Sequence, residues 1–71
     1  MRSVVLRNRI KVLRAEHDMT QDDLAGAIGV SRKTISTIEV GRFVPSTIIA
    51  LLIARHFDVA VETIFRIEEK A

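Results

Sequence analysis

The sequence contains no cysteine, so disulfide bonds and cysteine-based zinc sites are excluded. Its two histidines, His17 and His56, are far apart and do not form a pair with metal-ligand spacing. No apolar run approaches the roughly 18 residues that a transmembrane helix needs. The first residues also lack the long apolar segment and cleavage site of a signal peptide. We therefore expect a cytoplasmic protein of a prokaryote, an archaeon or a phage, with no metal, cofactor or membrane partner.

A chain of 71 residues is expected to form one small domain, 1–71, with a core at about 8–65 between an N-terminal arm and a C-terminal tail. At this size roughly 60% of the unfolded surface is buried, so stability is marginal. The hydrophobic fraction of 48% is high for so short a chain, which favours a partner chain as a further source of burial. The sequence has no glycine-rich phosphate loop and no room for a cleft. We predict that it is not an enzyme and binds no small-molecule ligand.

Positive charge is concentrated at the front of the sequence, although the net charge is only +2. Five basic residues and no acidic residue precede Glu16, namely Arg2, Arg7, Arg9, Lys11 and Arg14. From Asp58 onward, four acidic residues face only Arg66 and Lys70. Such a polarised chain can be oriented by a polyanion. Ordinary solvated surface accounts for the same distribution, so charge alone leaves nucleic-acid binding open.

Apolar residues recur at helical spacing in five segments. The predicted helices run from Asn8 to Glu16, from the Thr20 cap to Gly29, from the Ser31 cap to Gly41, from Thr47 to Phe57, and from Val61 to Phe65. The second and third are joined by roughly three residues, which is the helix-turn-helix arrangement.

Residues that favour helix ends support these boundaries. Thr20, followed three residues later by Asp23, is a weak form of the capping box. Ser31 is a natural N-cap for the third helix. Pro45–Ser46 marks the start of the fourth, and Asp58 is a candidate left-handed stop after it.

The two ends of the sequence contain candidate strands. SVVLR, residues 3–7, is rich in β-branched residues, and IFRIE, residues 64–68, alternates apolar and polar residues. The two segments are able to pair as a small ribbon. A frayed N-terminus and a continuing C-terminal helix would fit the same residues.

The stretch QDDLAGAIGVSRKTISTIEVG, residues 21–41, resembles the Cro/C1 (XRE) family of helix-turn-helix regulators. The similarity extends back through NRIKVLR and forward through PS and IARHF, so it covers nearly all of residues 8–65. It points to the compact group whose chain is little more than this domain. The resemblance implies an all-α, five-helix lambda-repressor-like fold, to which the two ends would add a short two-stranded ribbon. In this family the second helix of the motif enters the major groove of double-stranded DNA.

The resemblance also implies a role for each polar residue of the motif. Base edges would be read by Arg32, Lys33, Thr37 and Ser36. Phosphates would be bound by Gln21, Ser31, Thr34 and Arg42. Arginine and lysine suit the acceptor edge of guanine, so G·C pairs are expected in the half-site. Solvated helix surface is the alternative for Arg32 and Lys33, and Thr37 would equally fit a backbone or methyl contact.

Two further positions carry structural expectations. Arg14 and Glu39 match family positions that form an internal ion pair, so Arg14 is expected to stabilise the fold and not to contact DNA. Val40 stands where the family often has asparagine, which implies that one phosphate contact is lost or replaced by an apolar one.

Dimers in this family commonly form through the region of the fourth and fifth helices. The candidate interface residues here are Val44, Val61, Val59, Ile64 and Leu52. Ile48, Leu52 and Arg55 form a stripe at helical spacing, where an exposed apolar face would indicate an interface and a buried one extra core.

The sequence therefore predicts a sequence-specific DNA-binding transcriptional regulator, a repressor acting as a homodimer on a pseudo-palindromic operator. The alternative is a protein-interaction module, such as the DNA-binding antitoxin of a toxin–antitoxin pair. Antitoxins usually carry a disordered tail, whereas only about six residues follow Phe65 here.

Overall fold

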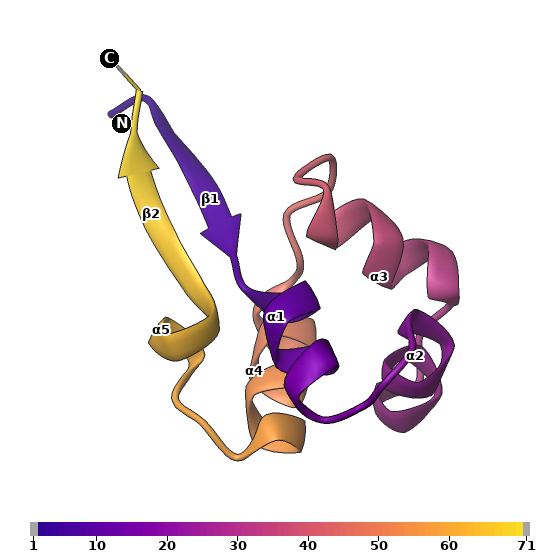
Figure 1. The fold of residues 1–71 in the computed structure, drawn as a ribbon. Helices are drawn as coiled ribbons and strands as arrows, with labels where there is room; N and C mark the ends of the chain where they lie inside the picture. Colours follow the sequence, from indigo (N-terminus) through magenta and orange to yellow (C-terminus); the bar gives the residue numbers. More distant parts are fainter. Residues whose placement is uncertain (1, 71) are drawn as a thin grey trace.

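The computed structural model describes residues 2–70, so Met1 and Ala71 of the predicted domain lie outside the described residues. Five helices and two strands follow one another along the chain (Figure 1). They are β1 (Val4–Asn8), α1 (Ile10–Glu16), α2 (Gln21–Ile28), α3 (Arg32–Glu39), α4 (Thr47–Phe57), α5 (Val61–Ile64) and β2 (Phe65–Glu69). No helix among residues 2–70 has both the length and the apolarity that crossing a membrane would require.

The five predicted helices are present, and the differences lie at the ends of the first and the last. Asn8 was expected in the first helix and Phe65 in the fifth, yet both belong to strands and pair with each other. Helical periodicity did not reveal this, because it describes neighbours within a few residues, whereas Asn8 and Phe65 are far apart in the sequence. The ribbon that the terminal segments were able to form is therefore confirmed.

Side-chain caps fix the starts of α2, α3 and α4 as the sequence predicts, whereas α1 and α5 have no side-chain cap. The Thr20 hydroxyl accepts a hydrogen bond from the Asp23 backbone N–H at 3.0 Å, and the Asp23 carboxylate accepts one from the Thr20 N–H at 2.9 Å. The backbone N–H of Thr20 first, and its hydroxyl second, stabilise the ionised Asp23 carboxylate and lower its pKa below the ordinary 3.8. Ser46 caps α4 by accepting from the Ile49 N–H at 3.1 Å. Asp58 ends α4 with a φ of 55°, in the left-handed conformation.

The core is a single apolar cluster to which all five helices contribute, and β2 adds its first residue. Its members are Ile10, Leu13, Leu24, Ala25, Ile35, Ile38, Ile53, Ala54, Phe57, Ile64 and Phe65. Among the described residues no polar or charged residue is buried with them. The burial of the apolar stripes of α2 and α3 in this cluster fixes how the two helices are held on the domain.

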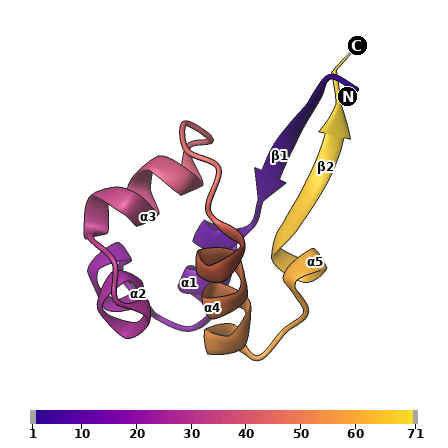
Figure 2. The same cartoon turned by 180° about the vertical axis from the view of Figure 1, so that it is seen from behind.

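The ribbon of β1 and β2 projects from the helical body, with both ends of the chain at its tip (Figures 1 and 2). The strands are antiparallel, with Leu6 opposite Ile67 and Arg7 opposite Arg66. Residues directly opposite each other in a sheet share a face. One face of the ribbon is therefore apolar at Leu6 and Ile67, and the other is charged.

Candidate nucleic-acid interface

The turn between α2 and α3 depends on one glycine. Gly29 has a φ of 82°, in the left-handed region where a side chain is strained. Its N–H and that of Val30 both donate to the Ala25 carbonyl, at 2.9 and 3.0 Å. This arrangement closes the last turn of α2 and sends the chain sharply into α3. The residues after the turn are thus presented at the start of a new helix.

Two predicted phosphate-binding residues hold the start of α3. The Ser31 hydroxyl accepts a hydrogen bond from the Thr34 N–H at 3.1 Å, and the two hydroxyl oxygens lie 2.9 Å apart. The pair occupies one of the N–H groups that a helix start leaves without an internal partner. Ser31 and Thr34 therefore fix the helix end, and one of their two hydroxyl hydrogens remains free to donate to a phosphate.

The outer face of α3 carries the predicted base-reading residues. Arg32 and Lys33 are exposed, whereas Ile35 and Ile38 on the inner face are buried. Because the buried isoleucines lock the inner face, the two basic side chains project from a fixed support. They lie at the end of the helix where backbone N–H groups also favour anions.

Ser36 and Thr37 are half-buried, which makes them less available than the two basic residues. The Thr37 hydroxyl contacts the carbonyl oxygens of Lys33 and Thr34 at 2.9 and 3.0 Å. Its hydrogen is thus committed inside the helix. Thr37 has only its acceptor lone pairs and its methyl group to offer a base, which favours the methyl or backbone contact considered from the sequence.

The starts of α2 and α3 border one open hollow of about 430 Å³. Gln21 and Arg32 both line it, so a predicted phosphate contact and a predicted base contact lie on the same side of the domain. Arg42 is exposed beyond the other end of α3, where its N–H donates to the Thr37 carbonyl at 3.0 Å. Basic side chains therefore stand in the first turn of α3 and just beyond its last residue.

An ion pair joins α1 to α3 beneath this face. Arg14 Nε lies 2.6 Å from Glu39 Oε2 and Arg14 Nη2 lies 3.1 Å from Glu39 Oε1. The two side chains are only 13% and 7% exposed. The hydrogen bond with Glu39 raises the pKa of Arg14 above its ordinary value. The structure thus places Arg14 inside the fold, as its match to the family implied.

Two side-chain hydrogen bonds that help to hold α3 in place were not predicted from the sequence. Gln21 Nε2 donates to Glu39 Oε1 at 3.2 Å, so the residue assigned to a phosphate also ties α2 to the ion pair. Asn8 Nδ2 donates to the Ile38 carbonyl at 3.0 Å, and Asn8 Oδ1 accepts from the Ile10 N–H. Asparagine just ahead of a helix is a capping signal, but its reach to α3 is decided by the tertiary fold.

The candidate dimer residues separate into three environments. Val44 is 69% exposed, and Val61 is half-buried in an apolar hollow of about 200 Å³ beside Leu6 and Leu51. Val59 is half-buried against the core. Ile64 is only 2% exposed, so its assignment to an interface is wrong: the short α5 turns this residue into the core.

The two apolar edges of α4 face different neighbours. Leu52 is half-buried beside Ala27 and Ile28 of α2, away from Val61, whereas Ile48 is 71% exposed. Leu51, which the sequence did not single out, is exposed and lies beside Val61. An almost wholly apolar helix gives no periodic contrast, so which of its edges stays exposed is not readable from spacing.

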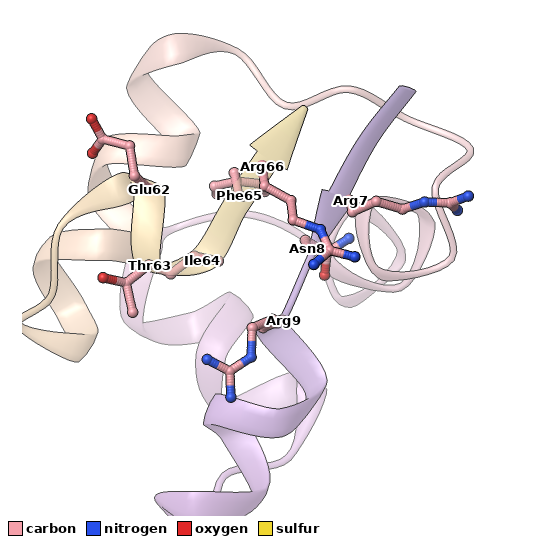
Figure 3. A pocket seen from close by; sticks show the side chains of 8 residues that line it. All are labelled: Arg7, Asn8, Arg9, Glu62, Thr63, Ile64, Phe65 and Arg66. Atoms are coloured by element: carbon pink, nitrogen blue, oxygen red, sulfur yellow. The ribbon is translucent and has the colours of Figure 1, made fainter. Parts of the chain in front are cut away.

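A hollow of about 310 Å³ lies where the ribbon meets α5 and the start of α1 (Figure 3). Arg7, Arg9 and Arg66 line it together with Glu62. Arg7 donates to Glu68 Oε1 at 3.0 Å, and Arg66 lies 3.5 Å from Glu68 Oε2. Arg7 and Arg66 therefore share the single negative charge of Glu68. No residue of α2 or α3 lines this hollow, which separates it from the face of α3.

Comparison with known proteins shows relatives of nearly the same length. The model of a helix-turn-helix family matches residues 10–64. An uncharacterised HTH-type transcriptional regulator of Methanocaldococcus jannaschii is 47% identical over 64 residues, 90% of this chain and 97% of that protein. The HTH-type regulator YgzD of Bacillus subtilis is 38% identical over 92% of this chain and 98% of its own. The solved structure of the transcriptional regulator VanUg shares the fold, with a TM-score of 0.80 over 99% of this chain and 93% of that one at 20% identity.

Proposed function

Because the chain belongs to the helix-turn-helix family of DNA-binding transcriptional regulators, we propose that it is a sequence-specific repressor that binds a pseudo-palindromic operator as a homodimer. The observation that carries the proposal is the pair Arg32 and Lys33, exposed in the first turn of a helix whose opposite face is fully buried. The major groove of DNA admits an α-helix and offers acceptor groups on guanine to such donors.

The remaining polar residues are assigned to the DNA backbone. Gln21 and the Ser31–Thr34 pair lie at the starts of α2 and α3, where N–H groups favour phosphates. Arg42 would bind a phosphate beyond the end of α3, and Val40, which is exposed, would add only an apolar contact. Such contacts set the position of α3 in the groove and carry no sequence information themselves.

A homodimer follows from the size of the site. One recognition helix reads about one half-site, and specific affinity usually comes from two such helices about 34 Å apart. Exposed Val44 and Leu51, with half-buried Val61 between α4 and the ribbon, provide apolar surface for a second copy. Val59 and Leu52 would lie at its margin. A bound dimer represses by covering a promoter.

Binding-site selection from random double-stranded DNA tests the proposal most directly. We expect an enriched pseudo-palindrome with G·C pairs under Arg32 and Lys33. Affinity for the selected site should then fall with salt, with a log–log slope near −0.9 per phosphate contact. A transcription assay on a promoter overlapping that site should show less transcript as the protein is added.

Other outcomes would reject the proposal in part or as a whole. No enriched site together with a flat salt dependence would favour the protein-interaction module. An enriched site without a two-fold repeat would reject the homodimer and leave DNA recognition standing. Increased transcription from the bound promoter would replace repression by activation.

A further inference from the structure

Beyond Phe65, whose N–H is bonded to α5, the outer edge of β2 is the one long backbone edge of the described residues that no other element approaches. β1 lies on its inner side, and both views of the fold leave its outer side open (Figures 1 and 2). The outer edge of β1 differs, because the loop after α3 flanks it: Val40, Phe43 and Val44 line a shared hollow of about 280 Å³. A free edge presents unpaired N–H and C=O groups that can pair with another strand.

The pairing pattern shows which backbone groups of β2 point outward. Arg9 donates to the Ile64 carbonyl and Lys70 to the Ser3 carbonyl, so the hydrogen-bonded pairs with β1 fall on even-numbered residues of the second strand. Hydrogen-bonded and non-hydrogen-bonded pairs alternate along antiparallel strands. The N–H and C=O groups of Ile67 and Glu69 therefore point away from β1, as does the Phe65 carbonyl. The Phe65 N–H is already bonded to Val61.

The side chains along this edge favour one register with a second copy. If two β2 strands pair antiparallel about Ile67, each Arg66 stands directly opposite Glu68 of the other copy. A shift by two residues in either direction places Arg66 opposite Arg66 or Glu68 opposite Glu68. Opposite charges across a strand pair stabilise it, and like charges destabilise it. The charge pattern is thus self-complementary in the register centred on Ile67, and repulsive in the two neighbouring ones.

The other face of the same pairing is apolar at its centre, where Ile67 stands between Phe65 and Glu69. Ile67 is 66% exposed although it sits in the middle of a strand and opposite Leu6. Pairing about Ile67 would bring the two Ile67 side chains together and make a continuous row, Leu6–Ile67–Ile67–Leu6, across four strands. Leu6 also lines the hollow that contains Leu51 and Val61, so this row is continuous with the apolar surface beside α4.

We propose that two copies of the chain associate by antiparallel pairing of their β2 strands about Ile67, which gives a four-stranded sheet in the order β1–β2–β2–β1. The inference rests on the homodimer of the proposed function and names its contact. Four backbone hydrogen bonds form, two between the Ile67 residues and two from Glu69 N–H to the Phe65 carbonyl of the other copy. Two Arg66–Glu68 pairs select the register.

Within one chain the ribbon contains a repulsive pair of like charges, and the pairing of two β2 strands would reduce this repulsion. Arg7 and Arg66 stand directly opposite each other on β1 and β2, an arrangement that Glu68 of the same chain offsets from a diagonal position. Glu68 of the second copy would place another carboxylate directly beside Arg66. The row across the sheet then reads Arg7, Arg66, Glu68 and Val5, and its like-charged neighbours gain a partner.

A charge reversal tests the register. Arg66→Glu places a carboxylate opposite Arg7 within the chain, so the ribbon itself is not weakened, but the same carboxylate faces Glu68 of the second copy. Sedimentation velocity over a dilution series should give a dimer dissociation constant about tenfold higher than that of the wild type. The double variant Arg66→Glu, Glu68→Arg restores opposite charges and should restore the wild-type association. Melting temperatures, measured in parallel at a concentration where the chain is monomeric, should not fall for Arg66→Glu.

A backbone variant supplies an independent test. Ile67→Pro removes an N–H that points away from β1, and proline is tolerated at such edge positions. It should abolish association while circular dichroism retains the helices. Unchanged association in Arg66→Glu and Ile67→Pro, with dissociation in Val61→Glu, would overturn the β2 contact and leave the homodimer intact. If the double variant associates as weakly as Arg66→Glu, the proposed register is wrong. A wild-type chain that remains monomeric with and without its selected operator would overturn both the contact and the homodimer.

Discussion

The face of α3 and the side of the domain formed by the ribbon and α4 are built in opposite ways. On the α3 side, the hydroxyls of Ser31 and Thr37 are hydrogen-bonded to the backbone of α3, and Ile35 and Ile38 beneath them are buried. On the ribbon side, Leu51, Val44 and Ile67 are exposed, and the ion pairs of the ribbon are mostly solvated. The first side therefore presents a polar surface on a fixed helix, which suits a hydrated, charged partner such as DNA. The second leaves apolar area and backbone groups that another copy of the chain would cover.

The largest expected effect concerns the support of the α3 face. Glu39→Ala removes the carboxylate that faces the nearly buried charge of Arg14 and leaves it only the hydrogen bond to the Met19 carbonyl, which should lower the free energy of unfolding by about 3 kcal/mol. Arg32→Ala removes an exposed side chain and should change it by less than about 0.5 kcal/mol. Urea denaturation of both variants measures the difference. Equal urea midpoints for the two variants would show that the Arg14–Glu39 ion pair adds no more stability than the exposed Arg32 side chain.

The second prediction distinguishes residues that recognise bases from residues that bind phosphates on the same surface. Arg32→Ala should cost about 1–3 kcal/mol of discrimination at one base pair of each half-site. Gln21→Ala should weaken binding to all sequences alike, because its contact is to phosphate. Competition binding with single-base variants of the selected site measures both effects. The reverse pattern would reject the docking of α3 in the groove.

A third prediction compares two helix caps, one on each side. Ser31→Ala and Ser46→Ala each remove a hydroxyl that caps a helix start, and each should destabilise the fold by about 1 kcal/mol. Only Ser31 lies on the proposed DNA surface. DNA affinity measured well below both melting temperatures should therefore fall for Ser31→Ala and stay unchanged for Ser46→Ala. A loss of affinity for Ser46→Ala would mean that α4 also contacts DNA.

The smallest expected effect is the acid dependence of the α2 cap. The pKa of Asp23 is lower in the folded chain than its ordinary 3.8. Its contribution is therefore present above the ordinary value and is lost as the pH falls through the lowered value. Asp23→Asn should melt slightly earlier than the wild type at neutral pH, and the two melting curves should converge under acid conditions. A gap that persists at acid pH would assign the effect to the amide and not to the charge.

Residues that act through their nearest neighbours were predictable one by one. Thr20, Ser31 and Ser46 cap helices because a hydroxyl reaches only N–H groups two or three residues away. Gly29 takes a positive φ because its neighbours require a sharp turn. Leu51 and Ile64 were not predictable in the same way. Leu51 belongs to an almost wholly apolar helix and Ile64 to a helix of only four residues, so their exposure depends on which other element packs against them.

The helices, the caps of α2, α3 and α4, and the polar first turn of α3 are predictable from the amino-acid sequence, since they follow from spacing and from bonds within a few residues. The links between distant segments depend on the tertiary fold. It paired residues 4–8 with 65–69, placed Gln21 on the Glu39 carboxylate, and left the outer edge of β2 open. The physical reason is that a backbone edge or a long polar side chain can take any partner of matching chemistry, and only packing of the core determines which one comes within reach.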